Sequence, residues 1–119
     1  MDPSLEVCKS LLSWFQTLII GESSSIETIN NGPAIVNILV QISPDHFTKL
    51  EPKIKVDVGS NWRLKMSNLK KINESIMEYY ADVLGLQITD IGKPDVVKLA
   101  ETNDIIQMGK LLRLILGMF

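Results

Sequence analysis

The stretch from Asn61 to Leu84 reads NWRLKMSNLKKINESIMEYYADVL, and it decides the fold. Apolar side chains recur in it every three or four residues, which is the spacing of one face of an α-helix. This face comprises Trp62, Met66, Leu69, Ile76, Tyr80 and Val83. A helix over the stretch would span about 36 Å at about 1.5 Å per residue, so we expect it to cross the whole domain. Gly85 follows and suits a left-handed helix cap.

The segments on either side of this stretch also favour helices. Asp2-Pro3-Ser4 is a typical helix start, and the apolar spacing after it predicts a helix to Leu18. The other predicted helices are a short turn at 26–29, a helix from Pro33 to Ile42, a short helix from Pro94 to Ala100, and a final helix capped by Asn103 or Asp104. Ser43-Pro44 is expected to stop the helix before it, because a residue that precedes proline disfavours helical backbone.

Residues 45–60 carry the weakest signal. Ile54, Val56 and Val58 alternate with Lys55 and Asp57, which is the period of two that strands show. No other segment alternates in this way, and a lone strand would leave its backbone groups without partners. We therefore predict a loop with a helical turn here, and an all-α fold in one domain covering residues 1–119.

Composition excludes several classes of protein. The 119 residues suffice for one core, and 45% hydrophobic with 22% charged residues is ordinary for a globular domain. A net charge of -2 does not favour nucleic acid as a partner. One cysteine excludes an internal disulfide and any zinc site built from several thiolates. The start is unlike a secretory signal, and the apolar stretch at 111–119 is too short to cross a bilayer, so we expect a cytoplasmic protein without membrane insertion.

Catalytic groups are scarce in this sequence. His46 is the only histidine, so no site with two or three histidine ligands can form, and we expect neither metal nor cofactor. His46 fits a surface position in the turn that starts at Ser43, and a Cys8–His46 nucleophile pair is the alternative. Cys8 belongs to the apolar face of the first helix, where cysteines are usually inert. Without a phosphate-binding glycine loop or a GxSxG motif, an enzyme is not expected.

Binding residues can be proposed on two of the predicted helices. Arg63, Lys65, Lys70 and Lys71 form a basic stretch that either faces an acidic partner or is simply a solvated helix face. Trp62 could anchor an interface, although its place on the apolar face favours the core. The final helix is apolar on most of its circumference, so its end either docks on the core or needs a cover.

Two runs of sequence resemble the Hook family. Residues 59–71, GSNWRLKMSNLKK, are similar to the family's "GDNWRLKxSNLKK" segment, and residues 111–117, LLRLILG, are similar to its "LLQLILG" segment. Shorter matches at 12–17, 31–32, 41–44, 84–88 and 94–96 keep the family's order and cover nearly the whole chain. The girdin-type relatives share this layout but match the segment around Trp62 less well.

The resemblance implies a calponin-homology-like helical domain that precedes a coiled coil in a dimeric parent protein. It also implies binding to a helix of the dynein light intermediate chain, a link to microtubules, and a cytoskeleton-associated role in moving cargo. Trp14, Trp62 and Leu69 lie in the matching segments and are expected in the core. Leu112, Ile115, Leu116 and Phe119 are the expected partner-binding residues, and the basic stretch from Arg63 to Lys71 is the expected microtubule contact.

The family's domain continues past its "LILG" run with another long helix that forms much of the dynein-binding groove. Because this sequence ends at Phe119, we expect it to lack that helix and the coiled coil. Three functions remain open: an adaptor domain that holds a partner helix in an apolar groove, a direct microtubule binder that uses its lysines, and a structural cap for a coiled coil.

Overall fold

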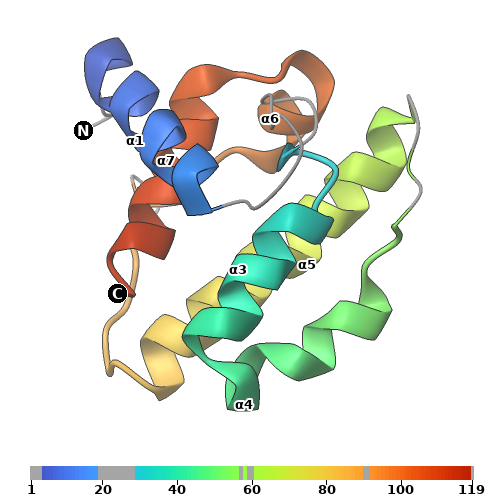
Figure 1. Ribbon diagram of the computed structural model, residues 1–119, viewed down its shortest axis with the longest axis vertical. Coiled ribbons are helices and arrows are strands. Elements are labelled where there is room, and N and C mark those ends of the chain that lie inside the picture. The colour runs from blue at the N-terminus through green and yellow to red at the C-terminus, as the bar shows by residue number, and fades with distance from the viewer. Residues whose placement is uncertain (1–3, 19–28, 57, 59–60, 90–91, 119) are drawn as a thin grey trace.

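The computed structural model describes residues 4–18, 29–56, 58, 61–89 and 92–118. Within these residues the regular elements are six α-helices and one 3₁₀-helix, with no strand. In chain order they are α1 (Leu5–Leu18), α3 (Pro33–Ile42), α4 (Pro44–Phe47), η1 (Thr48–Lys53), α5 (Trp62–Asp82), α6 (Val96–Thr102) and α7 (Ile105–Leu116) (Figure 1). The all-α prediction is confirmed. Of the turn predicted at 26–29, all but Ile29 lies outside the described residues.

Helix α5 is flanked at both ends by residues that favour helix termini. Asn61 Oδ1 accepts hydrogen bonds from Arg63 N at 3.0 Å and Leu64 N at 3.3 Å, which satisfies two of the donors that a helix start leaves open. At the other end Gly85 has a φ of 67°, and Leu86 N donates to Tyr80 O at 2.8 Å. The helix crosses the molecule diagonally (Figure 1) and contacts η1, α6 and α7, as predicted for a central element.

The core collects around the middle of α5. Leu69, Ile72 and Ile76 are at most 1% exposed, whereas residues 62–67 are exposed or half-buried. Side chains of nearly every other element join them in one cluster, including Phe15, Ile35, Leu39, Phe47, Leu99, Met108, Leu111 and Leu112. The buried face of α5 therefore begins about two turns later than the apolar pattern of its sequence suggests.

The two C-terminal helices are separated by adjacent capping residues. Asp95 Oδ1 accepts from Val97 N at 3.1 Å and Lys98 N at 3.2 Å, so α6 begins two positions after Pro94, the predicted start. Asn103 ends α6 with a left-handed φ of 52°. Asp104 then caps α7 by accepting from Ile106 N at 2.9 Å. Of the two predicted caps for the final helix, Asp104 is the one used.

The segment after α3 is more helical than predicted. Ser43 ends α3, but Pro44 begins α4 directly, because proline at a first helical position loses no hydrogen bond. After η1 the chain becomes extended, and Ile54 and Val58 are buried while Val56 is 79% exposed. The period of two in the sequence is therefore not matched by burial, because Val56 faces away from the core that covers Ile54, and no strand forms among the described residues.

Two buried asparagines join segments that are distant in sequence. Asn68 on α5 donates to Lys55 O and Asn31 O, both at 2.8 Å, and accepts from Lys55 N at 3.0 Å. Asn30 donates to Leu99 O at 2.9 Å and to Asn103 Oδ1 at 2.7 Å. These bonds hold the turn before α3 against α5 on one side and α6 on the other.

Helices α1 and α7 pack closely along their lengths. Cys8 is fully buried on α1, and its sulfur lies where a side-chain carbon on Gly109 of α7 would have to be placed. A glycine at this position therefore permits the close approach. In the described part of the chain, no helix combines the length and the apolar character that crossing a membrane requires.

Candidate functional site: an apolar groove and a basic surface

An apolar groove of about 400 Å³ lies where three elements converge. Its walls are the last residue of α1, the second half of α3 and a residue two positions after the end of α7. The lining residues are Leu18, Ile38, Gln41, Ile42 and Met118. Of these described residues four are apolar and Gln41 contributes a polar edge, which is the composition expected of a site for apolar side chains with an orienting group. The C-terminal end of the chain lies beside this region (Figure 1).

A second groove of about 350 Å³ lies beside α3. It runs between α3 and the extended segment after η1, and Gln41 borders both grooves. Pro33, Val36, Val40, Ile54 and Val56 supply its apolar lining, with Asn37 and Glu51 as further polar members. The outer face of α3 therefore separates two hollows, and Gln41 on that face donates to Asn37 Oδ1 at 2.7 Å.

The predicted partner-binding residues of the last helix are only partly at the surface. Leu112 and Ile115 are fully buried core residues, so their prediction as a binding surface is wrong for this chain. Helix α7 contacts α1, α5 and α6, so most of its apolar surface is buried in the core. Leu116 is 42% exposed, and Phe119 lies outside the described residues. Met118, which was not proposed, lines the groove and is the one described residue from this end that does so.

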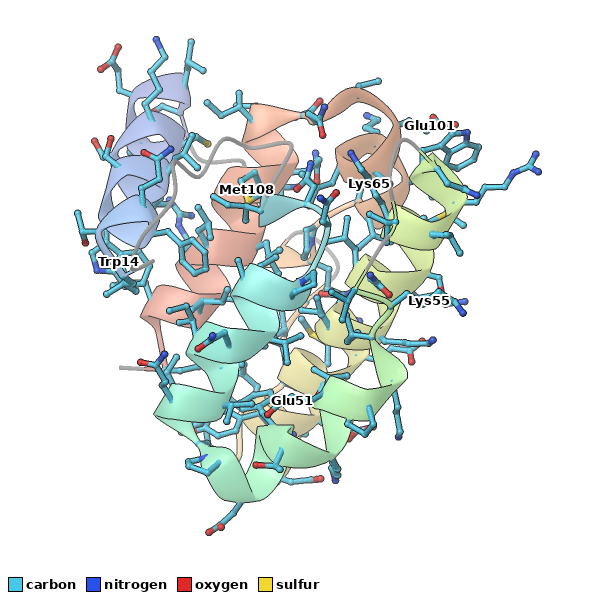
Figure 2. The ribbon with its side chains drawn as sticks, turned by 45° about the vertical axis from the view of Figure 1, so that its right-hand side comes forward. Trp14, Glu51, Lys55, Lys65, Glu101 and Met108 are labelled. Carbon is cyan, nitrogen blue, oxygen red and sulfur yellow. The ribbon has the colours of Figure 1, made fainter. Side chains whose placement is uncertain are left out.

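The predicted basic stretch does not form a single face. Arg63 and Lys70 are exposed, but Lys65 lies about 200° around the helix from Arg63, at about 100° per residue. Lys71 is half-buried, and its Nζ donates to Lys53 O at 3.0 Å. This bond holds the end of η1 against α5. Two lysines that the sequence pattern missed, Lys53 and Lys55, therefore lie on the side of α5 that carries Lys71 (Figure 2 labels Lys55 and Lys65).

We define the basic surface as Lys53, Lys55 and Lys71, drawn from two segments. Acidic residues limit it toward the C-terminal half of α5, where a shallow hollow is lined by Lys49, Lys53 and Lys71 together with Glu74 and Glu78. The positive charge is therefore local rather than a continuous stripe along the helix. The sequence pattern could not show that α5 contacts the segment before it, and this contact brings the lysines together.

The aromatic residues of the matching segments have different environments. Trp62 is 36% exposed, so the prediction that it belongs to the core is wrong. It stands at the first position of α5, ahead of the buried face, and the Arg63 guanidinium carbon lies 5.5 Å from its ring centroid. Trp14 is half-buried and packs on the core, edge-to-face with Phe15 at 6.2 Å (Figure 2). Leu69 is 1% exposed, which confirms its place in the core.

The proposed nucleophile pair is not assembled. Cys8 is buried against Gly109, whereas His46 on α4 packs against α5. His46 is half-buried rather than at the surface, with Nε2 3.1 Å from Ser75 O and its ring 5.4 Å from that of Tyr79. Among the described residues, no group of three histidine, cysteine or acidic side chains is arranged to hold a metal ion.

Comparison with known proteins bears on this geometry. The HOOK domain family matches residues 6–119. "Protein Hook homolog" of Branchiostoma floridae is 46% identical over 94% of the chain, and "Protein hook" of Drosophila melanogaster is 43% identical over 97%. "Protein Hook homolog 3" of Homo sapiens is 42% identical over 94%. The chain spans only 16–17% of the length of these relatives.

A solved structure shows the same fold. The solution structure of the conserved domain of mouse HOOK1 protein superimposes with a TM-score of 0.87 and 38% sequence identity. The match covers 99% of this chain and 73% of that one. The calponin-homology-like arrangement expected from the sequence is therefore confirmed.

Proposed function

This chain belongs to the HOOK domain family, and from that premise we propose that it is a non-catalytic adaptor domain that binds a partner helix. The observation that supports the proposal most directly is the apolar groove bounded by Leu18, Ile38, Ile42 and Met118. A helix with an apolar face can bury that face in such a groove, in the manner of other helix-in-groove complexes. The partner proposed from the family resemblance is a helix of the dynein light intermediate chain, which would connect cargo to microtubule-based transport.

The groove sets requirements on the guest helix. Its floor offers apolar contacts from two helices, so the guest needs apolar side chains three or four residues apart to reach both walls. Gln41 can donate or accept one hydrogen bond at the edge. Because none of the described residues that line this groove is charged, the affinity should depend on apolar burial and change little with salt.

Calorimetric titration of a dynein light intermediate chain helix into this chain tests the proposal. Ile42→Ser removes a half-buried apolar wall and should weaken binding about tenfold, which corresponds to about 1.4 kcal/mol. The matched control is Leu86→Ser, which removes an apolar side chain that is 55% exposed and lies outside the groove. Equal effects of the two substitutions, or tight binding unaffected by Ile42→Ser, would contradict the proposed site.

A direct microtubule contact is the second candidate function. The gathering of Lys53 and Lys55 beside Lys71 supports it, since an acidic surface is attracted by clustered lysines. Cosedimentation with microtubules at low and high ionic strength distinguishes the two functions, because contacts between exposed charges weaken steeply with salt. Lys53→Gln with Lys55→Gln should abolish this binding and leave the helix titration unchanged. A purely structural cap of a coiled coil would bind neither partner.

Two further proposals concern the full-length protein. Relatives named Hook are about six times longer than the chain, consistent with its 16–17% share of their length. A coiled-coil dimer as the parent protein, and a cytoplasmic, cytoskeleton-associated location, follow from the family resemblance and belong to that protein as a whole. The dimer is tested by sedimentation of the full-length protein, and the location by imaging it together with microtubules.

A further inference from the structure

Ser43-Pro44 is the one serine– or threonine–proline pair in the 119-residue sequence. The pair forms the corner between α3 and α4, where Ser43 ends one helix and precedes the first residue of the next. Figure 1 places α4 at the edge of the molecule opposite α6. Proline-directed kinases select a serine followed by proline, and proline differs from every other residue at that position because it has no amide N–H.

The surroundings, hydrogen bonding and backbone conformation of Ser43 at this corner suit recognition by a kinase. Pro44 and Asp45 are exposed and Ser43 is half-buried. The Ser43 side chain makes no capping hydrogen bond, so its hydroxyl is not engaged in holding the start of α4. The backbone of Ser43 has φ −145° and ψ 86°, which is extended rather than helical. A serine–proline pair at an exposed, non-helical corner can enter a kinase cleft with less rearrangement than one inside a helix.

We propose that Ser43 is a phosphorylation site for a proline-directed serine/threonine kinase that uses ATP. In the transfer, Ser43 Oγ forms a bond to the γ-phosphorus as the bond to the bridging oxygen of ADP breaks. The hydroxyl proton passes to the catalytic base of the kinase. The products are phosphorylated Ser43, ADP and the proton that the base releases to solvent, so atoms and charge balance without a further reactant.

Phosphorylation of Ser43 would change the affinity for the partner helix, an inference that rests on the proposed function. Its neighbour Ile42 lines the apolar groove, and Ile38 lies one helical turn earlier on the same wall. Phosphoserine carries about −1.5 to −2 charges near neutral pH. A guest helix seated on Ile42 would remove water from this group, and removing water from a charge is unfavourable. Phosphorylation therefore weakens binding of the partner helix.

Phosphorylation in vitro tests the assignment first. The chain is incubated with ATP and a mitogen-activated protein kinase, and its intact mass and fragment ions are measured. We expect one phosphoryl group, located on Ser43, and none on Ser43→Ala. Pro44→Ala retains the hydroxyl but lacks the directing proline, so its phosphorylation should fall at least about tenfold if the amide N–H at that position obstructs binding. Circular dichroism confirms that both variants are folded. An unmodified chain, or equal phosphorylation of Ser43→Ala, overturns the proposal.

Titration with the dynein light intermediate chain helix then tests the consequence. The phosphorylated chain should bind about tenfold more weakly than the same chain after phosphatase treatment, a difference of about 1.4 kcal/mol. Equal affinities would overturn the regulatory effect. If the unphosphorylated chain does not bind the helix, the proposed function and its regulation both fail, while the mass measurement still decides whether Ser43 is a kinase site.

Discussion

At the scale of single residues, the neighbours of a side chain decided its role more than its place in a pattern. Trp62 and Leu69 lie on the same predicted helix face, yet Trp62 is 36% exposed and Leu69 is 1% exposed. The difference arises because the first turns of α5 precede the part of the helix that other elements cover. Periodicity predicts which residues share a face, but it does not predict how far along the helix that face is buried.

This contrast gives a stability prediction. Leu69→Ala should lower the free energy of unfolding by about 2–5 kcal/mol, because it leaves a cavity in the core. Trp62→Ala should cost less than about 1 kcal/mol, and Lys70→Ala should stay within about 0.5 kcal/mol. Urea denaturation midpoints of the three variants measure these differences. A loss for Trp62→Ala as large as that for Leu69→Ala would show that the indole is buried after all.

The pH dependence of stability is predicted at Tyr80. Burial, together with the neighbouring Tyr79, raises the pKa of Tyr80 above its usual 10.0, and its hydroxyl donates to Leu114 O at 2.6 Å. The folded state thus holds this proton more tightly than the unfolded state does. The resulting stability is fully present below the unfolded pKa of about 10 and is lost as the pH rises through the higher folded value.

Thermal unfolding of the wild type and Tyr80→Phe from neutral pH to about pH 11 measures this effect. Near neutral pH the variant should be less stable by about 1 kcal/mol, because it lacks the bond to Leu114. At alkaline pH the difference should shrink or reverse, since phenylalanine cannot ionise. Parallel curves for the two proteins would exclude a contribution from Tyr80 ionisation.

At the scale of elements, helix caps were more predictable than packing distances. Gly85 and Asp104 act at the helix ends where they were predicted, because capping depends on a few adjacent backbone groups. The close approach of α1 to α7 was not predictable, because it requires Cys8 and Gly109, a hundred positions apart, to face each other. The same limit hid Lys53 and Lys55 from the predicted basic surface.

The α1–α7 contact supports a prediction of its own. Gly109→Ala places a carbon where the Cys8 sulfur lies, and it should destabilise the domain by about 1–3 kcal/mol through overpacking. Cys8→Ala in the same chain should restore part of that loss, because it removes the sulfur. Chemical denaturation of both single variants and the double variant yields the coupling energy. Additive costs would show that the two residues do not share the contact.

At the scale of the whole molecule, a few buried polar groups join segments that the apolar core alone would not position. Asn68 bonds to backbone groups of Lys55 and Asn31, so one side chain links α5, the extended segment after η1 and the turn before α3. The bonds are directional, whereas apolar burial is not, so they select one arrangement of these segments.

Asn68→Ala should therefore destabilise the domain by more than the loss of side-chain volume alone would. Three backbone groups in part-buried hydrogen bonds would lose their partner, and we expect a destabilisation of about 2–4 kcal/mol, measured by urea unfolding. Hydrogen exchange should show faster exchange of the Lys55 amide than in the wild type. Asn37→Ala, at an exposed site on α3, is the control and should change stability by less than about 0.5 kcal/mol.

By itself the sequence determined the helical class, the central helix, most helix ends and the family, because each depends on residues close together along the chain or on motifs such as GSNWRLKMSNLKK. Only the tertiary structure decided which apolar residues remain at the surface. Leu112 and Ile115 are covered by other helices, while Leu116 is 42% exposed and the half-buried Ile42 lines the groove. Exposure depends on the distances between elements, and these follow from packing between residues far apart in sequence, which no local pattern records.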